Sequence, residues 1–305
     1  MSLKKPLLIC VVGATAIGKT SLAIKLANAF DAEIISADSR QVFKEMNIGT
    51  AVPSKEELKS ATHHFIQNKS IFEDYSVGDF EREAITFLDH YFSKKKIAIL
   101  VGGSGLYVDA VVKGLDDFPQ VPSQIRLQLN SKLNNEGIEA LQNELKKVDP
   151  VYFVKVDINN PHRLIRALEI YRATGKPYST FINEKTANRN FETLFIGLTA
   201  KRETIYERIN QRVDKMVEAG LIDEAKALLP HKEKNALQTV GYRELFDYFE
   251  DKISLEESIS EIKKNTRRFA KRQTTWFRKN EAIHWFNFET DPSEIINFIK
   301  EKNAL

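Results

Sequence analysis

A glycine-rich segment that ends in a lysine and a threonine is the pattern in this chain best suited to chemistry. Residues 13–20 read GATAIGKT and fit the phosphate-binding pattern G-x-x-x-x-G-K-[ST]. Glycines let the backbone curl so that its N–H groups surround phosphate oxygens, while Lys19 supplies a cation and the Thr20 hydroxyl suits Mg²⁺. The sequence therefore predicts a phosphate or diphosphate site made of Gly13, Ala14, Thr15, Ala16, Ile17, Gly18, Lys19 and Thr20.

Asp38 is the carboxylate best placed to work at this site. A P-loop ATPase usually carries an aspartate at the end of an apolar strand, but the apolar run before Gly102 and Gly103 ends without an acid. Asp38 follows another expected strand, and the carboxyl ends of parallel strands face the same crevice as the phosphate loop. This placement suits a small-molecule kinase or a group transferase better than a mechanical ATPase. The alternative role for Asp38 is a cap or turn residue.

The elements that must hold these residues are those of a parallel α/β sheet. Apolar runs predict buried strands, and a segment with apolar residues at helical spacing follows the first run. The alternation of strands and helices predicts an α/β fold with a P-loop NTPase-like parallel sheet core. The expected strands lie at residues 7–12, 32–39, 94–103 and 193–200, and the helix after the phosphate loop lies at 20–30.

The alternation fails between residues 119 and 190. This stretch is polar, shows helical periodicity and is interrupted by prolines, which predicts a helical insert in the core. After the fourth expected strand, nearly all of the chain up to Lys279 has helical spacing. We expect the first part of the P-loop core at 1–118, the insert at 119–190, and the second part of the core with C-terminal helices at 191–305.

The composition excludes several classes of protein. The chain has 305 residues, of which 42% are hydrophobic and 29% charged, so it is neither disordered nor collagen-like. Its single cysteine, Cys10, excludes a disulfide scaffold. The longest apolar runs are far shorter than a membrane-spanning helix, and no signal peptide is apparent. We therefore expect a cytoplasmic protein without membrane contact.

Charge is unevenly distributed along the chain. The formal net charge is +3, yet residues 263–279 carry eight basic residues and no acid, so the rest of the chain sums to −5. Basic residues four apart in this segment, such as Arg268 and Arg272, share one helix face. Such a stripe favours contact with a polyanion, and the alternative is a solvated basic helix face.

Nine segments of the chain, in this order, resemble the IPP transferases, the family of bacterial tRNA dimethylallyltransferases (tRNA isopentenyltransferases). They are GATAIGKT, ISADSRQVF, IGTAVPS, HHF…DYSVGDF, VGGSGLY, NNPHRLIRALEIYRATGKP, RINQRVDKMVEAGLIDEA, LQTVGYRELFDYF and TRRFAKRQTTWFRK. Each is modest except the phosphate loop, but nine in order are specific. The resemblance covers residues 7 to 280.

The resemblance implies an activity. The family transfers a dimethylallyl group from dimethylallyl diphosphate to N6 of the adenosine at tRNA position 37, next to the anticodon. The phosphate loop then holds the prenyl diphosphate with Mg²⁺, and Asp38 accepts the proton from the attacking amine. Ser104 stands where the family usually has threonine, and its hydroxyl bridges the amine and the diphosphate. Arg212 matches the arginine that binds the diphosphate, with Arg208 or Arg202 assisting. Lys19 and Thr20 complete this catalytic set.

The resemblance also implies contacts with the tRNA anticodon stem-loop. Chemistry on a base requires the base to leave its stack, so a closed pocket for the flipped adenosine is expected. The pocket residues are Asp38, Ser39, Arg40, Gln41 and Ser104. The insert contributes Arg126, His162, Arg163 and Arg166. The later tRNA-contacting residues are Thr239, Val240, Gly241, Tyr242, Arg243, Arg268, Lys271 and Arg272. For Phe269 and Trp276, seven residues apart in the basic segment, we favour core packing over stacking on bases.

Three residues depart from the family pattern. Phe43 replaces the common tyrosine and loses its hydroxyl, Val52 replaces a lysine and loses its charge, and Gln67 replaces an aspartate. His63 and His64 do not suggest a metal pair, because adjacent residues on a strand point to opposite faces.

Three alternatives remain beside a tRNA dimethylallyltransferase. A free-nucleotide isopentenyltransferase shares the phosphate loop and the aspartate, but it needs neither a helical insert nor a basic C-terminal helix. A small-molecule P-loop kinase shares the core alone. A non-enzymatic RNA-binding module is disfavoured by the intact Lys19, Thr20 and Asp38. We expect a monomer acting on one tRNA.

Overall fold

The computed structural model of the protein describes residues 5–182 and 187–303. The chain forms two compact units. The larger consists of Met1–Lys113 with Asn188–Leu305, and the smaller of Gly114–Ala187. The smaller unit occupies most of the segment that the sequence predicts as a helical insert, 119–190. Each unit has its own buried core.

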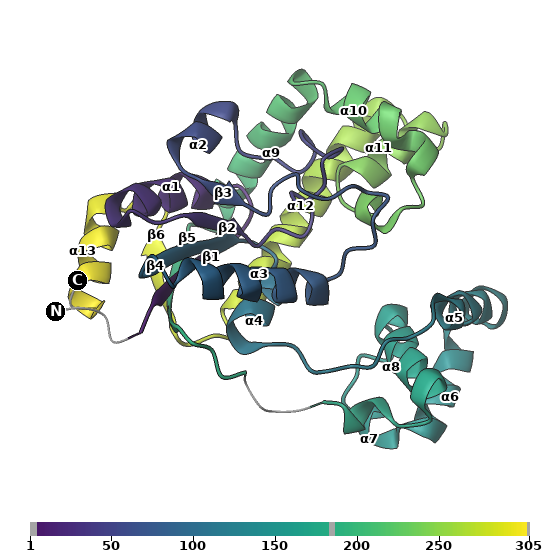
Figure 1. Ribbon diagram of the computed structural model, residues 1–305. Coiled ribbons are helices and arrows are strands. Elements are labelled where there is room, and N and C mark those ends of the chain that lie inside the picture. The colour runs from purple at the N-terminus through teal and green to yellow at the C-terminus, as the bar shows by residue number, and fades with distance from the viewer. Residues whose placement is uncertain (1–4, 183–186, 304–305) are drawn as a thin grey trace. The chain divides into compact units, whose positions relative to one another are not determined.

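The larger unit is built on a six-stranded sheet whose strands all run parallel (Figure 1). The strand order is β3-β2-β4-β1-β5-β6. The strands are β1 (Leu7–Gly13), β2 (Ile34–Ser36), β3 (His63–His64), β4 (Ile97–Gly102), β5 (Glu192–Thr199) and β6 (Ile283–Asn287). The predicted α/β fold with a parallel sheet is confirmed.

Two edge strands were not among the four expected from apolar runs. β3 pairs through only two residues, and β6 buries only Ile283, after which half-buried and exposed side chains alternate. An edge strand has a neighbour on one side only, and therefore does not need the continuous apolar run of a central strand. The chain after Lys279 thus adds a sheet strand as well as a helix.

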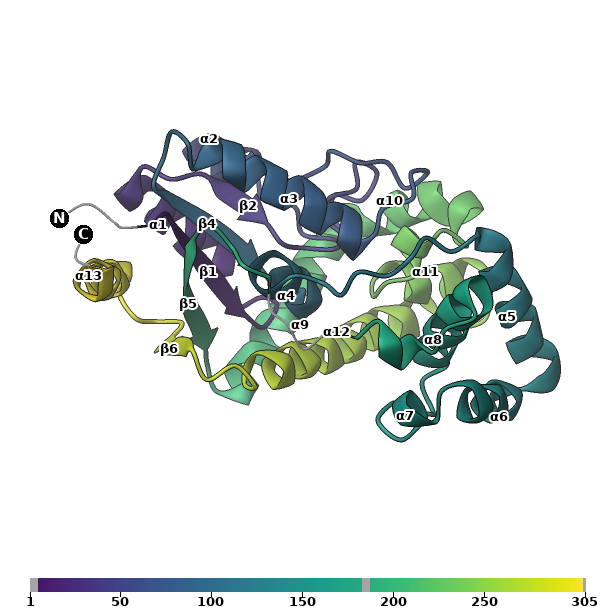
Figure 2. The ribbon, with the colours of Figure 1, turned by 60° about the horizontal axis from the view of Figure 1, so that its bottom comes forward.

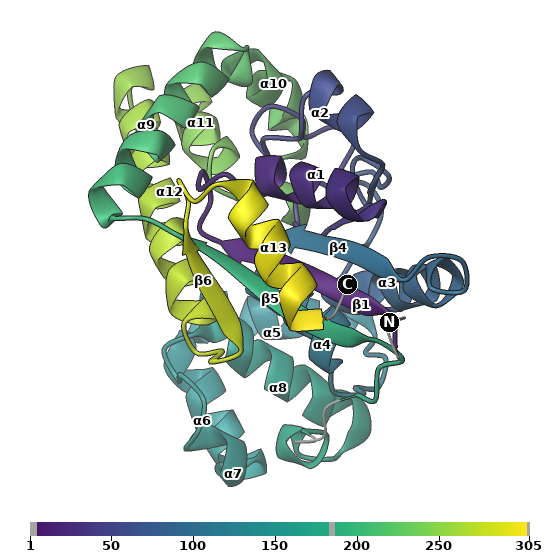
Figure 3. The same ribbon diagram turned by 90° about the vertical axis from the view of Figure 1, so that its left-hand side faces the viewer.

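Alternate residues of β1 supply the cores on the two faces of the sheet. Ile9 and Val11 pack in a core with α1 (Lys19–Phe30) and α13 (Pro292–Asn303), which lie together on one face (Figure 3). Leu8 and Cys10 pack on the other face with α3 (Val77–Tyr91) and α4 (Gly105–Lys113). Because helices cover both faces, β1 is buried along its whole length.

A helical region completes the larger unit and has a core of its own. Its helices are α9 (Arg202–Glu218), α10 (Leu221–Leu228), α11 (Tyr242–Phe249) and α12 (Leu255–Phe277). The long α12 begins at a capping box of Ser254 and Glu257 and passes the carboxyl end of β1 (Figure 2). It therefore brings residues from late in the chain to the phosphate loop. Short helices lie at α2 (Lys55–Ser60) and at the 3₁₀ segments Leu229–His231 and Asn235–Leu237.

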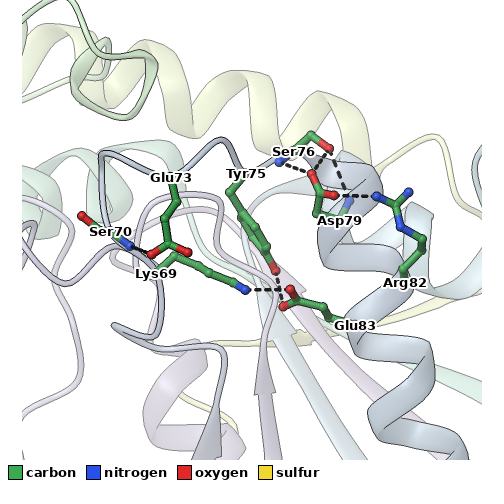
Figure 4. Close-up of polar contacts among 8 residues, drawn as sticks. All are labelled: Lys69, Ser70, Glu73, Tyr75, Ser76, Asp79, Arg82 and Glu83. Atoms are coloured by element: carbon green, nitrogen blue, oxygen red, sulfur yellow. Dashed lines mark hydrogen bonds and ion pairs between the residues drawn. The ribbon is translucent and has the colours of Figure 1, made fainter. Parts of the chain in front are cut away.

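A polar cluster fixes the loop that leads into α3 (Figure 4). Ser76 and Asp79 form a capping box, in which the Asp79 carboxylate also pairs with Arg82 at 2.5 Å. Glu83 then binds Lys69 at 2.6 Å and accepts a hydrogen bond from the Tyr75 hydroxyl at 3.1 Å. The cluster therefore anchors the incoming loop to the first turns of the helix.

The smaller unit is helical. Its helices are α5 (Ser123–Glu136), α6 (Ile138–Val148), α7 (Pro150–Phe153) and α8 (Pro161–Thr174), followed by a 3₁₀ turn at Tyr178–Thr180. Leucines from α5, α6 and α8 form its core. In the described part of the chain, no helix is long and apolar enough to cross a membrane.

Candidate active site

The phosphate loop connects β1 to α1 through two glycines that no other residue replaces without strain. Gly13 has φ 146° and lies against β5, where a Cβ atom would approach the Leu198 carbonyl oxygen to 2.7 Å. Gly18 has φ 108° and caps α1, which begins at Lys19. The loop backbone is therefore forced to curl at the N-terminus of a helix, which is the geometry that binds phosphate oxygens.

A cavity of about 790 Å³ opens at this loop, within the larger unit. Its wall contains residues of the phosphate loop, Asp38 after β2, and residues of helix α9. Strand ends and a helix from a distant part of the sequence therefore line the same cavity. Ten of the residues that the sequence predicts line it: Thr15, Ala16, Ile17, Gly18, Lys19, Thr20, Asp38, Gln41, Arg208 and Arg212. The volume suits a small diphosphate with a base beside it.

Three cations in the cavity bind oxygens of uncharged groups on the phosphate loop. Lys19 Nζ donates to the Ala14 carbonyl at 2.7 Å, and Arg208 Nε donates to the Ala16 carbonyl at 2.8 Å. Arg212 Nη1 donates to the Thr15 hydroxyl at 3.1 Å. These bonds hold the side chains without neutralising them, so the cavity keeps a positive charge ready for an anion.

Burial and charge disfavour the ammonium form of Lys19. Burial and, to a smaller extent, the neighbouring Arg212 lower the pKa of Lys19 to about 7, against the opposing effect of Asp38. Burial also lowers the pKa of Arg212, again against Asp38. A multiply charged anion in the cavity reverses this balance. A bound anion would therefore raise the pKa of Lys19 and favour its ammonium form.

Asp38 lies at the end of β2 with one oxygen already engaged. Its Oδ1 accepts the backbone N–H groups of Arg40 at 2.9 Å and Gln41 at 3.2 Å. Both amides bind the same oxygen, so Oδ2 is the one left to accept a proton. The turn role of Asp38 is therefore observed, and it leaves the second carboxylate oxygen for the predicted role as a base.

Ser104 and Gln41 are held by neighbouring strand ends. Ser104 Oγ, after β4, accepts the Ser39 backbone N–H at 3.2 Å and lies 3.3 Å from the Ser39 hydroxyl. The Gln41 amide nitrogen donates to the carbonyls of Thr50 at 3.2 Å and Ala51 at 2.9 Å. Gln41 thus fixes the cavity wall that follows it in the chain.

Tyr242, one of the predicted RNA-contacting residues, lies in the interior of the larger unit. Its side chain is completely buried, and its hydroxyl donates to Glu224 at 2.7 Å. That carboxylate also accepts the backbone N–H groups of Ile48 at 2.8 Å and Gly49 at 2.9 Å. The Tyr242 side chain therefore has no surface open to RNA in this structure, and its RNA contact stays a prediction. Its ring and Glu224 instead support the loop around Ile48, which lines the cavity.

The predicted core packing of Phe269 and Trp276 is also wrong. The two rings are 37% and 41% exposed, because both lie on the solvent side of α12. Phe269 lines the cavity, and Trp276 donates its indole N–H to Asp109 at 2.9 Å. Around them, the predicted RNA contacts Arg268, Lys271 and Arg272 are exposed, as is Arg243.

Other predicted RNA-contacting residues differ in their surroundings. In the smaller unit His162 and Arg163 are exposed. Arg126 instead forms a bidentate ion pair with the buried Glu169, at 2.5 and 3.1 Å. Arg166 lies 3.6 Å from the same carboxylate. In the larger unit Thr239 and Val240 are half-buried, Gly241 is buried, and Arg40 is half-buried beside Asp38.

The departures from the family pattern fall in different places. Phe43 is buried in the core of the helical region, where a hydroxyl would need a partner, and Val52 lines the cavity. Gln67 donates to the Lys44 carbonyl and to Asn47. The glutamine that replaces the family's aspartate is therefore hydrogen-bonded to its neighbours in this structure.

Sequence reasoning missed three residues that shape the cavity: Glu57, Glu224 and Gln273. Glu57 and Gln273 line it, and Glu224 holds its wall. The segments that contain Glu224 and Gln273 pointed to other residues, and Glu57 lies outside all nine segments. One signal was available for Gln273, because a lone amide lies on the buried stripe of α12 between Ala270 and Phe277.

Comparison with known proteins agrees with this geometry. The family model described as IPP transferase matches residues 41–280. A tRNA dimethylallyltransferase of Christiangramia forsetii is 60% identical over 295 residues, covering 97% of this chain and 98% of the relative. The crystal structure of the full-length tRNA isopentenylpyrophosphate transferase from Bacillus halodurans is similar with a TM-score of 0.72 and 40% identity, covering 98% and 97% of the two chains. A eukaryotic dimethylallyltransferase acting on tRNA has a TM-score of 0.79 and 30% identity, covering 98% of this chain and 76% of that one.

Proposed function

The chain belongs to the IPP transferase family, and from this premise we propose that it transfers a dimethylallyl group from dimethylallyl diphosphate to N6 of the adenosine at tRNA position 37. The observation that carries the proposal is the cavity that gathers the phosphate loop, two arginines and Asp38. The close relatives named tRNA dimethylallyltransferase support it. A tRNA acceptor places the reaction in the cytoplasm.

The cations of the cavity bind the diphosphate. Lys19, Arg208 and Arg212 exchange their bonds to the loop for bonds to phosphate oxygens, while the loop amides donate to the same group. As the bond from the prenyl carbon to the diphosphate oxygen breaks, negative charge grows on the leaving group. The fixed cations therefore stabilise the transition state more than the bound substrate.

The cavity residues fit a magnesium ion. The Thr20 hydroxyl and the carboxylates of Asp38 and Glu57 face one space, and Mg²⁺ prefers oxygen ligands, many of them from substrate phosphates and water. Thr20 would hold the ion. When bound, the ion withdraws negative charge from the diphosphate leaving group.

Asp38 takes the proton released at the amine. Its Oδ1 is held by two backbone amides, which orients the carboxylate toward the cavity that it lines. The N6 nitrogen attacks the prenyl carbon, and one of its hydrogens passes to Asp38 Oδ2. Ser104 lies beside Ser39 at the neighbouring strand end and orients the amine and the diphosphate.

The tRNA contacts come from exposed basic residues. Arg268, Lys271 and Arg272 on α12 bind phosphates of the anticodon stem-loop, and Thr239, Val240 and Arg243, at the start of α11, add further contacts. His162, Arg163 and Arg166 contribute from the insert. One chain contains the whole cavity, so a monomer is sufficient for catalysis.

One assay tests the proposal. Purified protein is incubated with Mg²⁺, labelled dimethylallyl diphosphate and either unmodified tRNA or AMP. We expect label in tRNA and none in AMP. Label in AMP would establish the free-nucleotide transferase instead. Absence of transfer to both acceptors, with ATP consumed in the presence of a small acceptor, would establish a kinase.

A further inference from the structure

One buried amide connects the phosphate loop to the loop that carries Ser104. Gln273, on α12, is 6% exposed and lines the cavity. Its Oε1 accepts the backbone N–H of Thr15 at 2.8 Å, and its Nε2 donates to the Gly103 carbonyl at 3.0 Å. A single side chain from late in the sequence thus spans the ends of β1 and β4.

A side chain at Gly103 would displace this amide. A Cβ atom there would lie 2.2 Å from Gln273 Nε2 and 3.5 Å from Lys19 Nζ. The side chain at this position must join an N–H group to a carbonyl. It therefore needs a hydrogen-bond acceptor and a donor at the same distance from the backbone of α12. A glutamine meets this need, whereas methionine has the length without the polar atoms and asparagine has the polar atoms without the length.

From these contacts we infer that Gln273 is a positioning residue for the diphosphate cradle, an assignment that rests on the proposed function. It commits the Thr15 N–H to a protein partner, so the amides that cradle the diphosphate come from the loop after Thr15. Arg212 holds the hydroxyl of the same threonine at 3.1 Å, which fixes Thr15 at its backbone and its side chain. On the other side, the bond to Gly103 sets the residue immediately before Ser104.

The consequence is a division of labour on α12. Lys271 and Arg272 are exposed, while the next residue, Gln273, faces the phosphate loop. Loss of the amide leaves the exposed cations in place. It therefore weakens diphosphate binding and turnover without weakening tRNA binding, a result that general loss of structure does not produce.

The test compares Gln273→Met with Gln142→Met. Gln142 is the matched control, because its amide nitrogen also donates to a backbone carbonyl, that of Ile158 at 2.9 Å, but in the smaller unit. Calorimetric titration with inorganic diphosphate and with dimethylallyl diphosphate gives the affinities, and transfer assays give kcat and KM. For Gln273→Met we expect at least about a ten-fold weaker diphosphate affinity and a lower kcat, with tRNA affinity within about two-fold. Gln142→Met keeps the wild-type values.

A second variant tests the same contact from the other side. Gly103→Ala displaces the amide sterically, so it reproduces the Gln273→Met defect, and the double variant is hardly worse than either single one. If Gln273→Met fails to fold, Gly103→Ala alone tests the contact.

Wild-type diphosphate affinity in a folded Gln273→Met protein, or loss of tRNA affinity alone, overturns the inference. A wild-type protein that binds diphosphate but transfers no prenyl group overturns the proposed function, while the diphosphate titrations still decide the role of Gln273.

Discussion

The basic residues of the cavity and those of the helical insert have opposite kinds of partners. In the cavity, Lys19, Arg208 and Arg212 bind carbonyl and hydroxyl oxygens of the phosphate loop. In the insert, Arg126 binds the buried Glu169, and Arg172 binds Glu144 at 2.8 Å through two nitrogens. The cavity side chains are held by uncharged oxygens, whereas these two insert arginines are paired with carboxylates.

This difference shows how to tell an anion-binding arginine from a structural one. A cation that is held in place by uncharged oxygens adds to the local positive potential. When an anion replaces those oxygens, the cation gives up only hydrogen bonds to uncharged groups. A cation paired with a buried carboxylate must leave that carboxylate uncompensated before it can bind another anion. The cavity cations are therefore able to bind an anionic ligand, whereas part of the insert's basic surface stabilises the insert itself.

The largest expected effect tests whether the cavity also performs chemistry. Asp38→Asn keeps the size of the side chain and an oxygen for the amides of Arg40 and Gln41, but it removes the base. We expect kcat for transfer to fall by about a thousand-fold, with unchanged tRNA affinity. Single-turnover assays and filter binding measure the two quantities. Turnover within ten-fold of wild type would show that Asp38 is not the base.

The second prediction sets the two kinds of arginine against each other. Arg212→Met removes a charge that faces the diphosphate, so kcat/KM for dimethylallyl diphosphate should fall by about a hundred-fold while the fold is retained. Transfer kinetics and circular dichroism provide the measurements.

The matched variant is Arg126→Met in the insert. It leaves Glu169 buried with only Arg166 near it at 3.6 Å, so we expect the insert to lose about 2 kcal/mol of stability. Hydrogen exchange of α8 amides detects this loss, and affinity for dimethylallyl diphosphate should be unchanged. If Arg126→Met weakens diphosphate binding as strongly as Arg212→Met, the comparison fails.

A third prediction concerns pH. The free protein holds Lys19 with a pKa lowered to about 7, and a bound diphosphate raises that pKa because it favours the ammonium form. Affinity for dimethylallyl diphosphate should therefore be highest below about pH 7 and should fall above it, by at most about ten-fold per pH unit. Calorimetry from pH 6 to 9 measures the slope. Lys19→Met removes the slope that belongs to Lys19, while the ionisation of the ligand itself remains. An equal slope in both proteins would assign it to the ligand.

The smallest expected effect lies on the exposed face of α12. Lys271→Ala should weaken tRNA binding by a few-fold and reduce the salt slope of log K by about one. Lys146→Ala, on an exposed turn of α6, is the control, for which we expect no change in the slope. Fluorescence titrations at several salt concentrations measure it. An unchanged slope for Lys271→Ala would show that this lysine does not touch phosphate.

Local patterns predicted the sheet and the phosphate loop well. Buried strands such as β1 carry continuous apolar runs, and the loop motif lies within eight consecutive residues, so both are visible in sequence. The edge strand β6 was missed because it lacks such a run. The position of Asp38 after an expected parallel strand placed it near the phosphate loop, and the resemblance added Arg208 and Arg212 to the same proposed site.

Contacts between distant segments could not be predicted in this way. Gln273 meets Thr15 across 258 positions of sequence, and Glu224 caps a loop that lies 175 residues or more away. Helical spacing was also insufficient for Tyr242, whose motif indicated RNA and whose ring is buried. The burial of a side chain and its hydrogen-bond partners depend on how the whole fold packs, and a sequence motif shows neither.

Mass spectrometry of the anticodon fragment tests the central claim most directly. Wild type and Asp38→Asn are incubated with dimethylallyl diphosphate, Mg²⁺ and unmodified tRNA, and the nuclease fragments are sequenced by mass. The account predicts one dimethylallyl group on the adenosine at tRNA position 37 with wild type and none with Asp38→Asn. A prenyl group on another nucleotide, or equal modification by the two proteins, would contradict it.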